Sequence, residues 1–385
     1  MPEARSGEST PADAPTPAGG GPGQDSAIEP APAGPATAED PATAEPATAE
    51  DPATAEPATA EDPATEEPAG DRILPRRSAM AVRLVALAVA LVLAIVLAFV
   101  VVVFTGPPSV AELRVRAGLD GKRELLIGVK DDQPGVAEFA NGQWSGFDID
   151  IAYLIAEDLG FRRSEIRFLS IESEDRARMQ ATDRNGERVG VDMVIASYSI
   201  TPEREQMAGV TFSAPYLYTE QGVITRHGHA PVSSLEDLKG RRVCSLAAST
   251  SETAAGRAGV LLSSRKKISE CFQAMDRGDF DAITTDAAIL AGYKSRFPAK
   301  YDHWDIGLDV TEAWGVNVGE NPALRDLVNL ALYRSRNDPK DNRWEEAFDR
   351  NFRAEEAVNE PAPIAVDQQP AVDEPNVRQW PWERV

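Results

Sequence analysis

The sequence has few of the residues that build metal sites and nucleophilic active sites. Its 385 residues include two cysteines and three histidines. His227 and His229 are near neighbours, but no further histidine or cysteine stands at the spacing of a metal site. Glycine-rich phosphate loops and nucleophile motifs are also missing. We therefore expect a solvated loop at the two histidines, and neither a metal nor another cofactor.

Basic residues are also scarce. The chain has 39 Lys and Arg against 62 Asp and Glu, a net charge of −23 at pH 7, which argues against nucleic-acid binding because no basic stripe can follow the phosphates. The acidic N-terminal part has no aromatic residue, and prolines recur at a regular spacing at Pro35, Pro46, Pro57 and Pro68. Such frequent prolines exclude a long helix, so residues 1–80 are predicted to be a disordered, self-repelling tail.

Residues 84–104 form a long apolar run without a charged residue. A run of about 21 residues can span ~30 Å of hydrocarbon as a helix. The flanking arginines, Arg72, Arg76, Arg77 and Arg83, all precede it. The positive-inside rule then predicts a single-pass anchor with a cytoplasmic tail and an extracellular remainder. A cleaved signal peptide is the alternative, disfavoured by the long run, the long preceding tail and the missing cleavage site.

Both cysteines, Cys244 and Cys271, fall in the part predicted to be exported. An even count in an oxidising compartment predicts one disulfide, and closing a loop of this length would contribute roughly 3–4 kcal/mol on the chain-entropy model. The alternative is a pair of buried free thiols.

From residue 122 onward, after a linker at 106–121, short apolar strands alternate with helical patterns, which predicts an α/β architecture. Residues 194–204 run from an apolar strand through a small-residue turn into a helix start, with Thr201 as N-cap and Pro202 in the first turn. Free N–H groups at such a turn attract an anion, and Arg204 can grip a carboxylate beside them. An ordinary capped helix with a solvated arginine is the alternative.

Three motifs stand in order along this part of the chain. They are Gly-Phe-Asp-Ile-Asp-Ile at 146–151, Ser-Ile-Thr-Pro-Glu-Arg at 199–204 and Phe-Ser-Ala-Pro-Tyr at 212–216. Together they resemble family 3 extracellular solute-binding proteins, the polar amino-acid receptors of ABC importers, over about residues 122–355. The Lys-x-Asp-Gln-Pro-Gly segment at 130–135 and the cysteine pair look most like actinobacterial glutamate/glutamine receptors.

The resemblance implies a type II periplasmic-binding-protein fold, in which two α/β lobes close on a ligand. Lobe one would comprise residues 122–219 and 313–355, and lobe two residues 220–312. Residues 356–385 are left as an extended C-terminal tail, whose Trp380 and Trp382 would dock on lobe one or on a partner.

The resemblance also implies the roles of the site residues. Arg204 would hold the α-carboxylate of an amino acid and Asp286 its α-ammonium, while Lys130 and Arg176 would face a distal carboxylate. The full set of expected ligand-binding residues is Lys130, Ser173, Arg176, Ser197, Ser199, Arg204, Ser249, Thr250 and Asp286. The alternatives are helix capping for the lobe-two residues and exposed surface charges for the two distal cations.

The expected function is a membrane-anchored receptor that binds glutamate or aspartate, with glutamine possible, and delivers it to an ABC permease. A sensor that signals to a membrane partner or kinase pathway is the alternative. An enzyme of the same fold, a periplasmic dehydratase or lyase, would need an acid or base beyond those committed to the ligand, so we expect no enzymatic activity.

Overall fold

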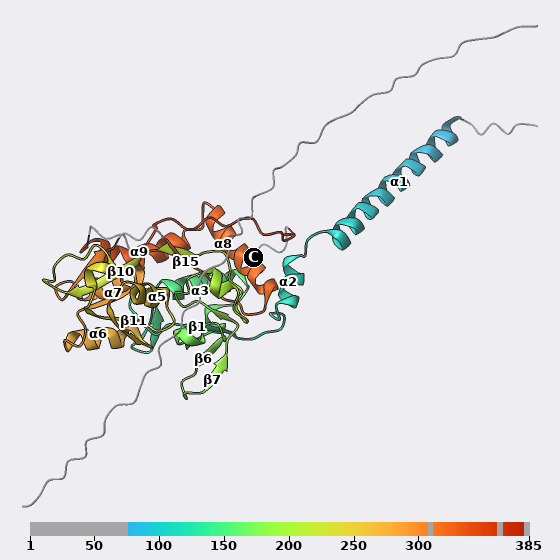
Figure 1. Cartoon of the computed structure of the whole chain (residues 1–385). Helices are drawn as coiled ribbons and strands as arrows, with labels where there is room; N and C mark the ends of the chain where they lie inside the picture. The colour runs from blue at the N-terminus through green and yellow to red at the C-terminus, as the bar shows by residue number, and fades with distance from the viewer. Residues whose placement is uncertain (1–75, 307–310, 360–364, 381–385) are drawn as a thin grey trace, which may run out of the picture. The chain divides into compact units, whose positions relative to one another are not determined.

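The computed structural model describes residues 76–306, 311–359 and 365–380 (Figure 1). The repeat tail predicted for residues 1–80 lies almost entirely outside the described residues. The described part comprises a long N-terminal helix, two α/β lobes and a C-terminal segment.

Lobe one is built on a five-stranded sheet in the order β7-β6-β5-β1-β8, in which β1 pairs in parallel with β5 and β8. Its strands are β1 (Leu125–Val129), β5 (Ile166–Ser170), β6 (Gln180–Thr182), β7 (Arg188–Gly190) and β8 (Met193–Val194). Its helices are α3 (Phe147–Asp158), α4 (Pro202–Glu205), α8 (Pro322–Asn337) and α9 (Arg343–Glu356). A small antiparallel sheet, β2 (Asp132–Gln133), β3 (Ala137–Ala140) and β4 (Gln143–Ser145), follows β1. The apolar face of α3 is buried because its aliphatic residues recur at helical spacing.

Lobe two has its own five-stranded sheet in the order β12-β11-β13-β10-β14. Its strands are β10 (Gln221–Arg226), β11 (Arg242–Leu246), β12 (Leu261–Arg265), β13 (Ala282–Asp286) and β14 (Tyr301–Asp305). Its helices are α5 (Thr250–Arg257), α6 (Ile268–Asp276) and α7 (Ala287–Arg296). The predicted disulfide is confirmed: Cys244 on β11 is bonded to Cys271 on α6, with Cα atoms 5.7 Å apart.

The chain passes between the lobes through two short antiparallel strands, β9 (Leu217–Thr219) and β15 (Glu312–Trp314). The protein thus has two mixed β-sheets, one in each lobe, joined by a pair of crossover strands. This is the two-lobed architecture that we predicted, so the predicted fold class is confirmed.

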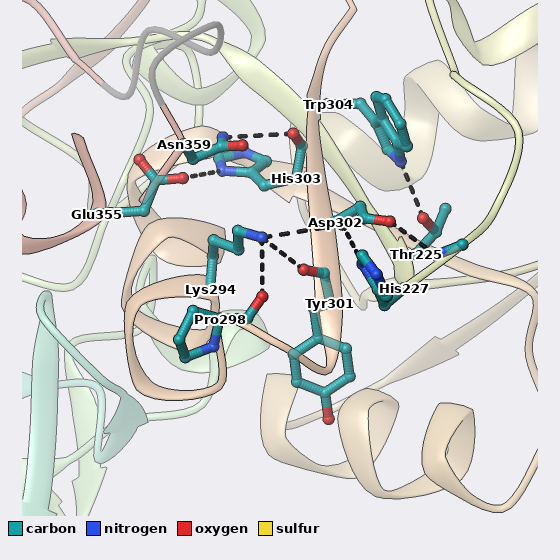
Figure 2. A network of polar contacts seen from close by, with 11 residues as sticks. Thr225, His227, Lys294, Pro298, Tyr301, Asp302, His303, Trp304, Glu355 and Asn359 are labelled. Atoms are coloured by element: carbon teal, nitrogen blue, oxygen red, sulfur yellow. Dashed lines mark hydrogen bonds and ion pairs between the residues drawn. The ribbon is translucent and has the colours of Figure 1, made fainter. Parts of the chain in front are cut away.

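Helix α9 also contacts both lobes, because it packs against α3 of lobe one and α7 of lobe two. Figure 2 shows the polar network at its C-terminal end. His303 of β14 lies 2.9 Å from Glu355 of α9 through its Nδ1 atom, and both side chains are buried. Lys294 of α7 donates to the carbonyl oxygens of Pro298 and Tyr301, which holds the loop that leads into β14.

The N-terminal helix α1 (Arg76–Thr105) contains an apolar stretch of 24 residues, Ala79–Val102, long enough to cross a membrane, and none of it is buried. The segment expected to be a linker, residues 106–121, contains helix α2 (Val110–Arg116). A capping box between Ser109 and Glu112 starts this helix, and its Leu113 is buried. Because α2 packs against α8, it is part of the folded body of lobe one.

Candidate ligand-binding site

Asp148, the first aspartate of the Gly-Phe-Asp motif, supports the turn at Ser197 that follows β8. Its Oδ2 accepts the N–H of Ser197 at 2.9 Å, and its Oδ1 accepts the hydroxyl of Tyr216 at 2.9 Å. Ser197 has a φ of 44°, a left-handed conformation that a side chain seldom adopts without such support. Burial raises the pKa of Asp148 to about 7. The motif therefore has a structural task, which is to present the turn.

Helix α4 starts at this turn as the sequence predicts, with the Thr201 hydroxyl accepting the N–H of Arg204 at 3.3 Å. The guanidinium of Arg204 lies 4.9 Å from the centre of the Tyr198 ring, and that of Arg176 lies 4.4 Å from the same centre. An aromatic ring attracts cations to its face, so Tyr198 gathers the two arginines into one cluster.

The two guanidiniums donate largely to backbone carbonyls. Arg176 donates to the carbonyl oxygens of Ser173, Ala196 and Ser197 at 3.2, 3.1 and 2.9 Å. Both arginines also donate to the carbonyl oxygen of Ala248 in lobe two, at 3.3 Å from Arg176 and 3.1 Å from Arg204. Ala248 has a φ of 56°, so an alanine takes up the left-handed conformation where glycine is the usual residue.

These neighbouring cations are electrostatically costly. Burial and, after it, the charge of Arg204 lower the pKa of Arg176 to about 9, and burial lowers the pKa of Arg204 as well. Tyr198 and Asp286 act in the opposite direction on both groups. A cluster of this kind is stabilised by an anion that reaches it.

Asp286 ends β13 and is 3% exposed. It precedes α7, but its side chain makes no capping hydrogen bond to that helix. Its Oδ2 instead accepts the indole N–H of Trp314 at 2.6 Å. Burial, followed by the charge of Glu312, raises the pKa of Asp286 to about 8. A cation placed beside this carboxyl would favour its charged form.

Lys130 follows β1 and is 1% exposed. Its ammonium group donates to the hydroxyl of Ser173 at 3.3 Å. Burial lowers the pKa of Lys130, and among the neighbouring acids Asp132 opposes this shift most. The three residues expected at the distal end of the ligand, Lys130, Ser173 and Arg176, therefore lie together, and the two basic side chains are buried rather than exposed.

The lobe-two residues separate into two roles. The hydroxyl of Ser249 accepts the N–H of Glu252 at 3.0 Å and thus caps α5. The hydroxyl of Thr250 donates to the carboxylate of Glu312, at 2.8 and 2.9 Å from its two oxygens. The hydroxyl of Ser199 in lobe one donates to the same carboxylate at 2.5 Å. The structure thus brings all nine expected residues to one region between the lobes, with Ser249 at its edge.

Two residues of this region were missed in the sequence. Glu312 lies on the crossover strand β15, and Gln133 accepts the Ser197 hydroxyl through its Oε1 at 3.2 Å. The side-chain nitrogen of Gln133 is buried and has no hydrogen-bond partner among the described residues. The position of Gln133 within the Lys-x-Asp-Gln-Pro-Gly segment was the one sequence feature that pointed to a role in the site. No sequence feature pointed to Glu312.

The lobes also meet beside this region. The ammonium group of Lys267 lies 2.7 Å from Asp131, the hydroxyl of Tyr293 donates to the carbonyl oxygen of Asp132 at 2.8 Å, and the N–H of Ser269 donates to Oδ2 of Asp132 at 2.9 Å. Buried cations from lobe one thus lie near a buried carboxyl from lobe two where the lobes meet. The fold and this site define a two-lobed ligand-binding protein.

Residues 125–352 match the bacterial extracellular solute-binding proteins, family 3, and the chain belongs to that family. It is 32% identical over 223 residues to the glutamate-binding protein GluB of Corynebacterium efficiens, a match that covers 54% of this chain and 73% of that protein. It is 30% identical over 250 residues to the ABC transporter glutamine-binding protein GlnH of Bacillus subtilis, which covers 63% of this chain and 85% of that one. Among solved structures, an ancestral arginine-binding protein bound to glutamine superimposes with a TM-score of 0.52 at 30% identity, over 60% of this chain and 98% of that one. The resemblance predicted from the motifs is thus confirmed.

Proposed function

We propose that this protein is an amino-acid receptor whose preferred ligand is glutamate or aspartate. The observation that carries the proposal is the placement of unlike charged groups on opposite lobes: Arg176 and Arg204 lie on lobe one and Asp286 on lobe two. Arg204 would take the α-carboxylate and Asp286 the α-ammonium, so that only the closed form engages both ends of the zwitterion. Lys130 and Arg176 are then the cations that a distal carboxylate would neutralise.

Relatives support this choice of ligand class. GluB is a glutamate-binding protein and GlnH a glutamine-binding protein, and this chain covers 73% and 85% of their lengths. Both ligands are amino acids with a polar end, which is the ligand class proposed here. The choice between acid and amide rests on the two distal cations, because a neutral amide would leave their charge uncompensated.

The test is calorimetric titration of the purified protein with glutamate, aspartate, glutamine and asparagine. We expect the two acids to bind more tightly than the two amides, by roughly 10²-fold, since one well-made charged pair contributes a few kcal/mol of discrimination. Equal affinity for glutamate and glutamine would contradict the assignment of the distal cations, and no binding of any of the four would contradict the receptor itself.

We propose that the receptor is held at the cell membrane by α1, with the binding lobes outside, and that it delivers its ligand to an ABC permease. The apolar stretch of α1 supports the anchor, and the family supports the import role. Uptake of labelled glutamate by cells that lack the gene tests the delivery: uptake should fall and return on complementation.

A sensor is the second candidate, favoured by the long acidic tail that precedes the anchor. An import receptor has no evident need of this tail. Unchanged glutamate uptake in the deletion strain, together with an altered transcriptional response to external glutamate, would favour the sensor.

An enzymatic role has little support in the site. Asp148 has the pKa of a general acid or base, but both of its oxygens are occupied, one by Tyr216 and the other by the N–H of Ser197. Asp286 is assigned to the ligand's ammonium group, and Glu312 accepts hydroxyl groups from both lobes. We therefore infer a binding function without catalysis.

A further inference from the structure

The C-terminal segment beyond the family match is attached to lobe one. Residues 365–380 begin beside the crossover strand β9, where Val366 donates its N–H to the carbonyl oxygen of Tyr218 at 2.9 Å. The segment then follows α8: the side chain of Gln369 donates to the carbonyl oxygen of Leu332 at 3.3 Å, and Arg336 donates to the carbonyl oxygen of Gln369 at 3.1 Å. Gln369 is buried, so this part of the segment is firmly packed.

The end of the segment meets the short connection between α1 and α2. The N–H of Arg378 donates to the carbonyl oxygen of Pro108 at 2.9 Å, and Arg378 pairs with Ser109 in a parallel β-bridge. Its guanidinium donates to the carbonyl oxygen of Val102 in the last turn of α1 at 2.7 Å and lies 3.7 Å from Glu112 at the start of α2. An arginine at this place also complements the negative end of the helix dipole.

Gly106 leaves room for this contact. A Cβ atom at Gly106 would lie 2.5 Å from the carbonyl oxygen of Val102 and 3.2 Å from Nη1 of Arg378. Any side chain at residue 106 would therefore crowd the arginine and the carbonyl group that it binds.

Trp380 lies against the apolar helix itself. Its ring centre is 6.3 Å from that of Phe99, a residue inside the apolar stretch Ala79–Val102, and the Arg378 guanidinium is 5.1 Å from the Trp380 ring. Phe99 is less than one turn from the end of that stretch. If α1 spans a bilayer, the ring of Trp380 is thereby placed at the level where hydrocarbon meets headgroups, which is where tryptophan is enriched in membrane proteins. The side chain of Arg378 is 11% exposed and contacts Val102, Glu112 and the Trp380 ring, so it positions the tryptophan at this level.

We propose that Trp380, positioned by Arg378, forms a second membrane contact in the lipid headgroup region beside the outer end of α1. This inference rests on the proposed membrane topology. Only residues 106–109 separate α1 from α2, a reach of about 14 Å at most for an extended chain. With the C-terminal segment fastened to α8 and to this connection, lobe one is held at the bilayer and lobe two is the lobe that moves when the ligand binds.

The experiment uses the full-length protein in phosphatidylcholine vesicles, with or without bromine atoms on the lipid acyl chains, which quench nearby tryptophans. We expect brominated lipid to quench part of the wild-type tryptophan emission, and Trp380→Phe to lose most of that quenched part. The matched control is Trp304→Phe, because Trp304 lies in the lobe-two sheet and donates to Thr225; it should leave the quenched part unchanged.

A second variant perturbs the contact without removing a tryptophan. Gly106→Val places a branched side chain against Val102 and Arg378, and the quenching should fall. Absence of quenching in the wild-type protein, or equal quenching in wild type and Trp380→Phe, would overturn the proposal. Titration of the same vesicles with glutamate separates the membrane contact from the proposed ligand. Glutamate binding without tryptophan quenching by the lipid would contradict the membrane contact alone. Quenching without glutamate binding would contradict the proposed ligand alone.

Discussion

Replacing Lys130 by methionine is a sharp test of the proposed ligand. Lys130 is fully enclosed, and its one described hydrogen bond goes to the hydroxyl of Ser173. Burial lowers its pKa, which means that the folded protein disfavours the charge. Methionine has a similar length and no charge, so Lys130→Met removes the cation and leaves little space unfilled.

The expected effects on stability and on binding have opposite signs. Exchange of a buried charged group for an apolar one of similar volume is often neutral or stabilising, so we expect an unchanged or higher midpoint of thermal unfolding. A carboxylate about 4 Å from the ammonium group would gain roughly 4 kcal/mol at an effective dielectric constant of about 20. Desolvation of the ligand and the nearby charge of Asp132 reduce this gain, and about 2–3 kcal/mol, or roughly 30–150-fold in affinity for glutamate, should be lost.

The assay is calorimetric titration of wild type and Lys130→Met with glutamate and with glutamine. Glutamate affinity should fall much more than glutamine affinity, so that the acid–amide gap narrows by about tenfold or more. Lys300→Met is the control, because Lys300 pairs with Asp276 on the surface of lobe two; it should change neither affinity. An acid–amide gap that survives in Lys130→Met, in a variant that still unfolds at the wild-type temperature, would refute the proposed role of this lysine.

Three other predictions follow from the disulfide, the buried aspartate and the anchor. The double variant Cys244→Ala/Cys271→Ala should lower the free energy of unfolding by about 3–4 kcal/mol on the loop-entropy model, measured by urea unfolding. Glutamate affinity should rise as the pH rises from 6 to 8, because Asp286, whose pKa is raised to about 8, must release its proton to pair with the ligand's ammonium group. The rise should approach tenfold per pH unit well below that pKa and level off above it, and Asp286→Asn should abolish it. Protease added to intact cells should spare an epitope tag at the N-terminus, and loss of the tag would contradict the topology.

Sequence reasoning performed best where a motif carries its own local geometry. Thr201 and Pro202 mark the start of α4, so the position of Arg204 in the first turn of this helix could be predicted without knowledge of the rest of the fold. The paired cysteines likewise predicted a contact between β11 and α6. The family resemblance supplied the two-lobed arrangement, which local patterns alone leave open.

Sequence reasoning performed worst for contacts between segments that are far apart in the chain. Glu312 is a single acid in a three-residue strand, and its partners Ser199 and Thr250 are 113 and 62 residues away. His303 and Glu355 are separated by 52 residues, and nothing in their neighbours marks them as a buried pair. Residues 106–121 were expected to be a linker, and α2 within them was missed. Seven residues are too few for a helix to be stable alone, and α8, far along the chain, provides the packing.

The charges around the site make Asp132 the residue on which the choice between acid and amide depends. Asp132 is the neighbour that most favours the charged form of Lys130, yet its Oδ2 accepts the N–H of Ser269 and the lysine donates to Ser173. The described residues show no ion pair between Lys130 and Asp132, which agrees with the proposed role of the lysine at the distal end of the ligand. Asp132→Asn removes a negative charge that competes with the ligand's distal carboxylate for Lys130. The ratio of glutamate to glutamine affinity should therefore rise by a few-fold to about tenfold, the effect of one partly screened charge. Calorimetry with both ligands measures this ratio. A ratio that falls in Asp132→Asn would contradict this reasoning, because it would show that Lys130 needs the charge of Asp132 to stay protonated.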